Sequence, residues 1–169
     1  PITCIAAEPL LNQTVQPDLQ PSLIESIRFK NTIKFCDIEI PVDRQDVKER
    51  LEKEMLLALW DRPQVILWMK RAAKYFPHIE SILKKHKLPL DLKYIPLIES
   101  ALKPHASSSK GAVGYWQFLK STGKRYNLRI DSLIDERRNI FKSTQAASRY
   151  IKDLEKRFGS YLLAVSAYN

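Results

Sequence analysis

Residues 88–100 read Leu-Pro-Leu-Asp-Leu-Lys-Tyr-Ile-Pro-Leu-Ile-Glu-Ser, and this stretch decides the fold of the chain. Apolar residues recur in and just after it at helical spacing: Leu92, Ile95, Ile98 and Leu102. The pattern predicts a helix that turns this face to a core, is bent by Pro96 and is ended by Pro104. Glu99 lies beside the apolar face, so we expect its carboxyl group at the margin of the core.

A glycine-rich aromatic segment follows the predicted helix. Residues 111–118 read Gly-Ala-Val-Gly-Tyr-Trp-Gln-Phe. Gly111 and Gly114 permit backbone angles that suit a tight turn or a small hairpin. The segment is therefore expected to bring aromatic side chains and one amide next to the helix that carries Glu99.

Glu99 is the candidate catalytic residue. Partial burial disfavours a carboxylate and raises its pKa, which would keep a proton available for donation near neutral pH. A helical glutamate beside apolar residues is, taken alone, more often a solvated residue at the rim of a core. The neighbouring polar groups favour the catalytic interpretation, because they suit hydrogen bonding to Glu99 or to sugar hydroxyl and acetamido groups: Ser100, Gln117, Tyr168 and Asn169.

The aromatic residues of this region have two interpretations. Tyr115 and Trp116 offer flat apolar faces on which pyranose rings could stack. Trp116, Phe118 and Tyr168 are equally well explained by packing in the core, where large aromatic side chains beside a turn are commonly found. The sequence leaves both alternatives open.

Charge is unevenly distributed along the chain. The net charge is +9, and residues 88–169 hold 14 Lys and Arg against 7 Asp and Glu. Such a surface favours polyanionic partners, among them nucleic acid, acidic cell-wall polymer and anionic lipid. No run of five or six basic residues marks a nucleic-acid tail, and no apolar run is long enough to span a membrane. Charge alone does not choose among these polyanions, and we expect no nucleic-acid partner.

Cys4 and Cys36 are the only cysteines. Neither belongs to a pattern that predicts a zinc site, so no metal and no cofactor is expected. In an exported protein a Cys4–Cys36 disulfide would close a loop of about 30 residues and contribute ~3–4 kcal/mol. Because the sequence shows no leader, it is interpreted either as cytosolic or as exported with the leader removed.

Three segments are expected. Residues 1–42 are predicted to be an extended arm with a bulged edge strand near Ile33–Val42. Residues 43–87 are predicted to be helical: one helix capped by Asp43, one starting at Asp61-Arg62-Pro63, and a shorter one restarted by Pro77. Residues 88–169 are predicted to be the catalytic domain, incomplete at its C-terminus.

Within the last segment, Ser143 or Thr144 is expected to cap a long helix that Gly159 ends. Residues 161–169 are predicted to be a central core helix. Between the aromatic turn and the long helix stand three acids, Asp131, Asp135 and Glu136. Arginines follow so closely that we expect internal salt bridges. A mechanism with one carboxyl group then becomes attractive, although glycosidases commonly use two.

Several motifs together resemble a known family. They are residues 88–100, residues 104–118, Ile134-Asp-Glu-Arg-Arg138, Lys142-Ser-Thr-Gln-Ala-Ala147 and Ala167-Tyr-Asn169. In this order they resemble the soluble lytic transglycosylase domain of the membrane-bound lytic murein transglycosylase D type. The chain departs from the family at Leu119-Lys120, where a pair such as Met-Pro is usual, and at Asn139-Ile140, where Asp-Pro is usual. The family also continues beyond Ala-Tyr-Asn.

The resemblance implies a mainly α, goose-lysozyme-like fold with a short β-hairpin, found in the periplasm or cell envelope. It implies cleavage of the β-1,4 bond between N-acetylmuramic acid and N-acetylglucosamine in peptidoglycan glycan strands, with 1,6-anhydromuramoyl ends as product. Glu99 would act first as acid and then as base.

In the same resemblance, Ser100 would orient Glu99, and Ser108, Tyr115 and Gln117 would line the glycan groove. Tyr168 and Asn169 would face the acid. The alternatives are a lysozyme-type hydrolase and a non-catalytic peptidoglycan-binding module. A monomer is favoured.

Overall fold

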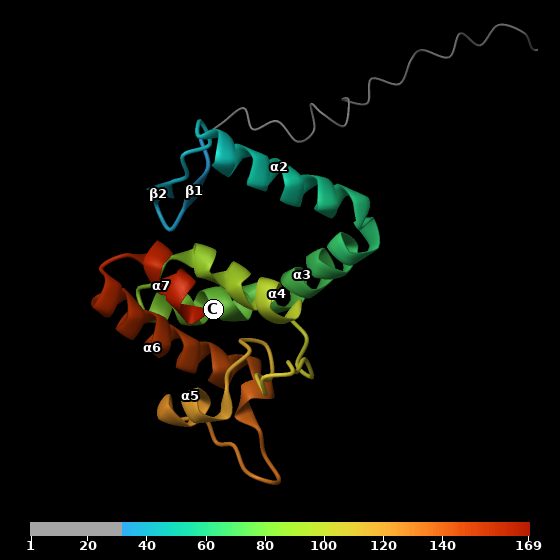
Figure 1. Cartoon of the computed structure of the whole chain (residues 1–169). Coiled ribbons are helices and arrows are strands. Elements are labelled where there is room, and N and C mark those ends of the chain that lie inside the picture. Colours follow the sequence, from blue (N-terminus) through green and yellow to red (C-terminus); the bar gives the residue numbers. More distant parts are fainter. Residues whose placement is uncertain (1–31) are drawn as a thin grey trace, which may run out of the picture.

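The structure, a computed structural model, describes residues 32–169 and is mainly helical with one short hairpin (Figure 1). The predicted fold class is confirmed. Its elements are β1 (Lys34–Phe35), β2 (Ile38–Glu39), α2 (Gln45–Trp60), α3 (Arg62–Lys85), the 3-10 helix η1 (Leu90–Tyr94), α4 (Ile95–Ser100), α5 (Lys120–Arg125), the 3-10 helix η2 (Glu136–Arg138), α6 (Ile140–Phe158) and α7 (Tyr161–Tyr168).

The hairpin replaces the bulged strand that we predicted. β1 pairs antiparallel with β2, with Phe35 opposite Ile38. The two turn residues between them, Cys36 and Asp37, both have positive φ angles, 50° and 62°. A two-residue turn of this hand matches the twist of the strands. It also explains the change of phase in the apolar pattern, because the side chains on either side belong to different strands.

The hairpin tip is anchored to the helical body. Cys36 is buried in the core, and its backbone N–H donates to Asp91 Oδ2 at 2.7 Å. Burial raises the pKa of the Cys36 thiol to about 12. Its predicted disulfide partner, Cys4, lies outside the described residues, as does most of the predicted arm. The disulfide therefore stays a prediction.

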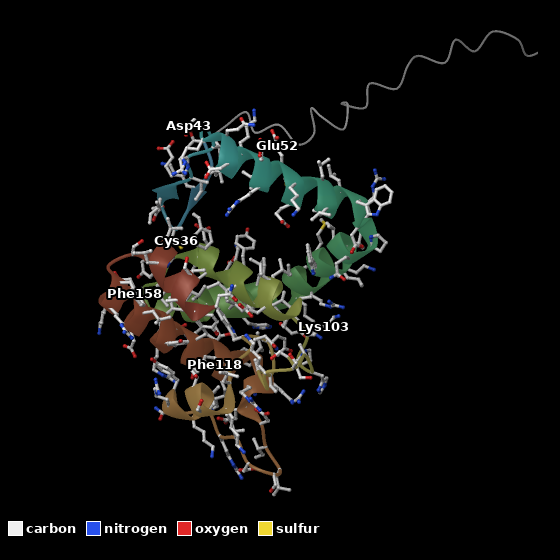
Figure 2. All side chains as sticks on the ribbon, in the orientation of Figure 1. Cys36, Asp43, Glu52, Lys103, Phe118 and Phe158 are labelled. Carbon is white, nitrogen blue, oxygen red and sulfur yellow. The ribbon has the colours of Figure 1, made fainter. Side chains whose placement is uncertain are left out.

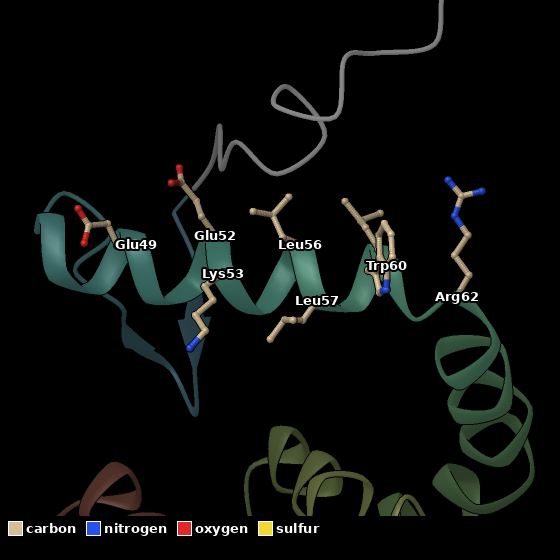
Figure 3. A pocket seen from close by; sticks show the side chains of 8 residues that line it. Glu49, Glu52, Lys53, Leu56, Leu57, Trp60 and Arg62 are labelled. Atoms are coloured by element: carbon tan, nitrogen blue, oxygen red, sulfur yellow. The ribbon is translucent and has the colours of Figure 1, made fainter.

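Helix α2 stands apart from the other helices in Figure 1. It begins after Arg44 with no side-chain cap, so the predicted cap at Asp43 is wrong. None of its residues is buried, although its apolar residues have helical spacing. Leu56, Leu57 and Trp60 instead line a surface hollow of about 860 Å³ along this helix (Figure 3).

Helix α3 starts where the sequence predicts and continues further than expected. The Asp61 side chain accepts a hydrogen bond from the Gln64 N–H at 3.2 Å, and proline occupies the first turn. The helix then passes through Pro77 to Lys85, so the predicted restart is wrong. Proline removes a single backbone donor, and buried side chains on the following turns, Ile79 and Leu83, hold the helix against the core.

Helix α6 is capped by Asn139, and not by Ser143 or Thr144 as we predicted. Asn139 Oδ1 accepts from the N–H groups of Phe141 and Lys142, both at 3.0 Å. Asparagine and aspartate both serve well at this position, so Asn139 supplies an N-cap although this chain departs here from the family pattern. Gly159, with φ of 73°, ends the helix as predicted.

The core lies between α3, α6, α7 and the glycine-rich loop. Trp116 and Ile151 are fully buried at its centre, with Ile79 and Leu83 of α3 beside them. Helix α7 contributes a fully buried Ala164 but leaves Leu163 half exposed, so it is less central than we expected. This core supports the helix α4 from one side, and α4 carries Glu99.

Candidate active site

The end of α4 fixes the position of Glu99. The helix stops at Ser100, earlier than the predicted end at Pro104, because Ala101 and Leu102 both adopt left-handed backbone angles. Their N–H groups donate to Leu97 O at 2.9 Å and Pro96 O at 3.2 Å. Two consecutive left-handed residues that are not glycine are strained, and such strain persists only where the surroundings impose it.

The inner face of this segment differs in one residue from our prediction. Leu92 and Leu102 are buried as expected, and Ile95 is 5% exposed. Ile98 is 82% exposed, so its predicted burial is wrong. Ile95 and Ile98 are three residues apart on α4, so their side chains point about 60° apart around the helix axis, and only Ile95 faces the core.

The Glu99 carboxyl group is half-buried, and this burial raises its pKa above the ordinary value. A carboxylate near the C-terminal end of a helix is also disfavoured by the helix dipole. Among residues 32–169, no side chain or backbone N–H donates a hydrogen bond to it, and no cation lies in salt-bridge distance. The site therefore favours the protonated acid.

Ser100 does not bind the Glu99 carboxyl group. Its buried hydroxyl lies 2.9 Å from Pro96 O and 2.8 Å from Tyr115 O, so its one proton is shared between two backbone carbonyls. The contact with Tyr115 ties the end of α4 to the glycine-rich loop.

The glycine-rich loop is a compact double turn. Val113 pairs with both Ser107 and Phe118 in isolated antiparallel bridges. Ser108 lies at the exposed tip, where its hydroxyl accepts from the Ala112 N–H at 3.1 Å. Gly114 has φ of 83°, and a Cβ atom there would overlap the carbonyl oxygen of Arg137. Only glycine allows this close approach.

Arg137 is a buried clamp on the same loop, which the sequence did not single out. Its guanidinium donates to Phe118 O at 3.0 Å and to Gly111 O at 3.2 Å, one at each end of the loop. Asp135 holds the guanidinium through contacts of 2.9 and 2.7 Å. The Asp-Glu-Arg-Arg motif carried this signal, because an arginine flanked by acids can be buried only when it is paired.

Tyr115 and Trp116 are both buried, 5% and 0% exposed. The expectation that their ring faces are open to a sugar is therefore wrong, and for Trp116 the packing alternative holds. The Trp116 Nε1–H donates to Thr144 Oγ1 at 3.0 Å. The Tyr115 ring lies edge-on to Tyr75 at 5.1 Å, and burial together with a hydrogen bond to Tyr75 raises the pKa of Tyr115.

Gln117 adopts a left-handed backbone angle, φ 47°, and its side chain folds back onto the loop. Its Nε2 donates to Gly114 O at 2.8 Å and to Ala106 O at 3.3 Å. Its amide oxygen accepts no hydrogen bond from the described part of the chain. The half-buried amide therefore presents an acceptor at the surface of the loop.

Tyr168 closes the site from α7. Its hydroxyl donates to Trp116 O at 2.8 Å, and its ring packs against Trp116, Phe118 and Tyr150 with centroid distances of 6.4, 6.2 and 5.1 Å. Burial raises the pKa of Tyr168 well above its ordinary value, and the charge of Glu99 adds to this effect. Glu99 and Tyr168 therefore lie within electrostatic range. Asn169 follows directly and is exposed.

The other acids of this region are engaged elsewhere. Asp135 pairs with Arg137 at 2.7 Å, which confirms an internal salt bridge in the predicted stretch, and Asp131 pairs with Arg129 at 2.6 Å. Glu136 accepts from the Arg129 N–H at 2.8 Å. Arg137 holds the pKa of Asp135 below its usual range. Glu99 differs from all three in having no such partner, and burial raises its pKa.

Within residues 32–169, no group of three or more His, Cys, Asp or Glu side chains is placed to hold a metal ion. None of the helices in this range combines the length and the apolar character needed to cross a membrane.

Comparison with known proteins identifies the family. Residues 77–169 match the family described as "Transglycosylase SLT domain". The chain is 42% identical over 100 residues to "Membrane-bound lytic murein transglycosylase D" of Escherichia coli (strain K12), and equally to the protein of that name from Escherichia coli O6:H1. The chain therefore belongs to the Transglycosylase SLT domain family, as its motifs predicted.

The matched region is a minor part of these relatives. It covers 59% of this chain and 22% of the length of each of the two Escherichia coli proteins. The match to the family begins inside α3 and includes α4, the glycine-rich loop, α6 and α7. Every residue predicted for the site lies inside it.

Proposed function

We propose that this chain carries the catalytic site of a peptidoglycan lytic transglycosylase. Membership of the Transglycosylase SLT domain family and the name of the Escherichia coli relatives support this activity. The observation that carries the proposal is the state of Glu99. It is a half-buried acid with a raised pKa and no partner among the described residues, and it stands beside Tyr168 and the glycine-rich loop.

In the proposed reaction, protonated Glu99 donates its proton to the glycosidic oxygen between N-acetylmuramic acid and N-acetylglucosamine. The C–O bond breaks, and the acetamido oxygen of the muramic acid itself attacks the anomeric carbon. Glu99, now a carboxylate, removes the proton from the 6-hydroxyl group, which displaces the acetamido oxygen. A 1,6-anhydro ring forms, and Glu99 regains its proton. No second carboxyl group takes part, in agreement with the engagement of Asp131, Asp135 and Glu136.

The remaining site residues have distinct proposed roles. Ser100 positions Glu99 by fixing the end of α4 to the loop. Gln117 offers its amide oxygen to a sugar hydroxyl group, and Ser108 and Asn169 are exposed where a glycan strand could reach them. Tyr115 supports the site by packing, since its ring is buried, and half-buried Tyr168 supports it through the hydrogen bond from its hydroxyl to Trp116 O.

Digestion of purified sacculi tests the reaction. Anhydro products differ from hydrolysed products by one water, so mass spectrometry of the released muropeptides separates a lytic transglycosylase from a lysozyme-type hydrolase. We expect anhydro ends from the active protein and a loss of at least ~10²-fold in rate for Glu99→Gln. The assay uses both this chain and a version extended beyond Asn169. Undiminished activity of Glu99→Gln would refute the assignment of the acid.

The non-catalytic alternative makes a different prediction. A peptidoglycan-binding module that lacks turnover would bind sacculi but release no muropeptides, with or without Glu99. Nucleic-acid binding through the basic half would instead show an affinity that falls steeply with salt and ignores Glu99. A pull-down with sacculi tests the first alternative, and a titration with duplex DNA tests the second.

We also propose the cellular setting. Peptidoglycan strands as the partner imply an exported protein in the periplasm or cell envelope, and the name of the Escherichia coli relatives agrees with this location. Residues 88–169 would form the catalytic unit and residues 43–87 its support. We favour a monomer, peripherally associated with the envelope. Cell fractionation and analytical ultracentrifugation test these two statements.

A further inference from the structure

A basic cleft of about 630 Å³ lies beside the predicted site, between α3 and the loop that follows α4. It is lined by Lys70, Arg71, Lys74, Tyr75, Leu102, Lys103, Pro104, His105 and Ala106. Lys103 is labelled in Figure 2, close after α4. Four of these nine residues carry a full positive charge and none is acidic, so the cleft has one sign of charge.

The four cations of this cleft are not neutralised by the described residues. Lys70, Arg71, Lys74 and Lys103 form none of the salt bridges found in residues 32–169. Lysine and arginine that converge without carboxylates repel one another and attract an anion. An anionic ligand would supply the missing counter-charge.

The cleft is built into the same structure that positions Glu99. Arg71 Nη1 donates to Ala101 O at 3.0 Å, two residues after the acid. The Tyr75 ring forms part of the wall and contacts the buried Tyr115 of the glycine-rich loop. On the far side, Arg138 Nη1 lies 3.2 Å from His105 Nδ1 and steadies the loop. A group bound here would therefore lie next to the reacting sugar.

The chemistry of the lining favours a peptide that carries carboxylates over a membrane surface. Binding to a lipid surface needs exposed apolar side chains beside the charges. The apolar residues that line this cleft, Leu102 among them, are buried or half-buried. Peptidoglycan bears short peptides with free carboxylates on its muramic acid residues. A peptide tethered to a bound glycan strand reaches an adjacent cleft at high effective concentration.

We propose that this basic cleft binds the carboxylate groups of the peptide attached to the glycan strand, a proposal that rests on the function given above. Lys74 and Lys103 contact the peptide from the two walls, one on α3 and one on the loop. Arg71 mainly holds the wall in place through Ala101. The cleft then makes the protein prefer glycan that still carries its peptides over bare glycan.

The test compares ligands by isothermal titration calorimetry, in a Glu99→Gln background that prevents turnover. The ligands are a muropeptide tetrasaccharide, the same saccharide freed of peptide by an amidase, the free peptide, and the free peptide with its carboxylates amidated. We expect the peptide to increase the affinity of the saccharide about tenfold, an amount typical of two or three partly exposed charge pairs. Amidation of the carboxylates is expected to abolish binding of the free peptide.

Variants assign the effect to the cleft. Lys74→Glu combined with Lys103→Glu is expected to remove the tenfold preference and to leave binding of the peptide-free saccharide unchanged. The matched control is Lys120→Glu combined with Lys142→Glu, which changes the net charge equally at two exposed sites outside the cleft. Circular dichroism checks that both variants are folded.

Three results would overturn the proposal: no preference for the peptide-bearing saccharide, an equal loss in the control variant, or stronger binding of the wild-type cleft to phosphatidylglycerol vesicles than to the peptide. Failure of the glycan function is distinguishable, because it abolishes binding of the peptide-free saccharide. The titration with free peptide then tests the cleft independently of the glycan.

Discussion

Helices α2 and α6 have the same kind of sequence pattern and opposite surroundings. Both carry apolar residues at helical spacing, and both are helices in the structure. Helix α6 buries eight residues, whereas α2 buries none. The difference teaches that periodicity identifies the face of a helix that could be buried, but a partner elsewhere in the chain must be present to bury it. The candidate site lies in the packed unit, by which we mean α3, α6, α7 and the glycine-rich loop.

Gly114→Ala should show the largest effect, because it breaks the packed unit at its tightest contact. A methyl group there overlaps the Arg137 backbone, and the left-handed φ adds strain. We expect a loss of roughly 4 kcal/mol or more in the free energy of unfolding. Chemical denaturation measures it. The control is Gly111→Ala, which has a similar φ but open space around it, and should lose only about 1–2 kcal/mol. Equal losses would contradict the close approach.

A pair of leucine substitutions tests the comparison directly. Leu154 of α6 is 8% exposed and Leu57 of α2 is 52% exposed. Leu154→Ala leaves a cavity and should lower the free energy of unfolding by about 2–4 kcal/mol. Leu57→Ala should change it by no more than ~0.5 kcal/mol. Urea denaturation of both variants measures the contrast. If Leu57→Ala were as costly as Leu154→Ala, α2 would be packed in solution against something that covers it.

Glu99→Gln should have a smaller effect on stability, with the opposite sign. The pKa of Glu99 is raised in the folded protein above its ordinary value of 4.5. The folded state then holds its proton more tightly, so the wild type loses stability as the pH rises from the ordinary pKa through the raised one. The variant lacks this loss. We expect it to be the more stable protein at pH 7, with the difference vanishing below about pH 4. Thermal melts across this range measure it.

The pH dependence of activity is a second test of the raised pKa of Glu99. Because Glu99 must be protonated to act as acid, kcat/KM should fall as the pH rises through its raised pKa. The pKa of Asp135 is shifted in the other direction. Arg137 lowers the pKa of Asp135, so this pair stabilises the fold above the ordinary pKa of aspartate and is lost as the pH falls through the lowered value. A profile that followed an ordinary carboxyl group would contradict the partial burial of Glu99.

Local signals predicted the helices well and their surroundings poorly. Asp61 with Pro63 marked the start of α3, and Gly159 marked the end of α6, because caps and left-handed residues act within one turn of the chain. Pro77 does not restart a helix as predicted, because the packing of Ile79 and Leu83 offsets the cost of one missing hydrogen bond. The predicted burial of Ile98 was wrong because apolar spacing does not say how far the buried face extends around a helix.

The same difference between local signals and tertiary contacts holds for the candidate site. Its parts could be predicted from order and residue type: an acid after an apolar helical run, a loop with glycines, and a late tyrosine. Their contacts could not, because each joins segments far apart in the chain. Ser100 binds the Tyr115 carbonyl, Arg137 holds both ends of the loop, and Tyr168 binds the Trp116 carbonyl.

Short-range chemistry was thus enough to predict most of the helical segments and to single out Glu99 as a candidate acid, since backbone preferences and capping depend on a few neighbouring residues. Which faces are buried was settled by segments that meet only in the folded chain. Contacts between these segments bury Trp116 and Tyr115 and remove water from one side of Glu99. No part of the described chain buries a residue of α2. Desolvation is a property of the whole packed neighbourhood, and no single stretch of residues encodes it.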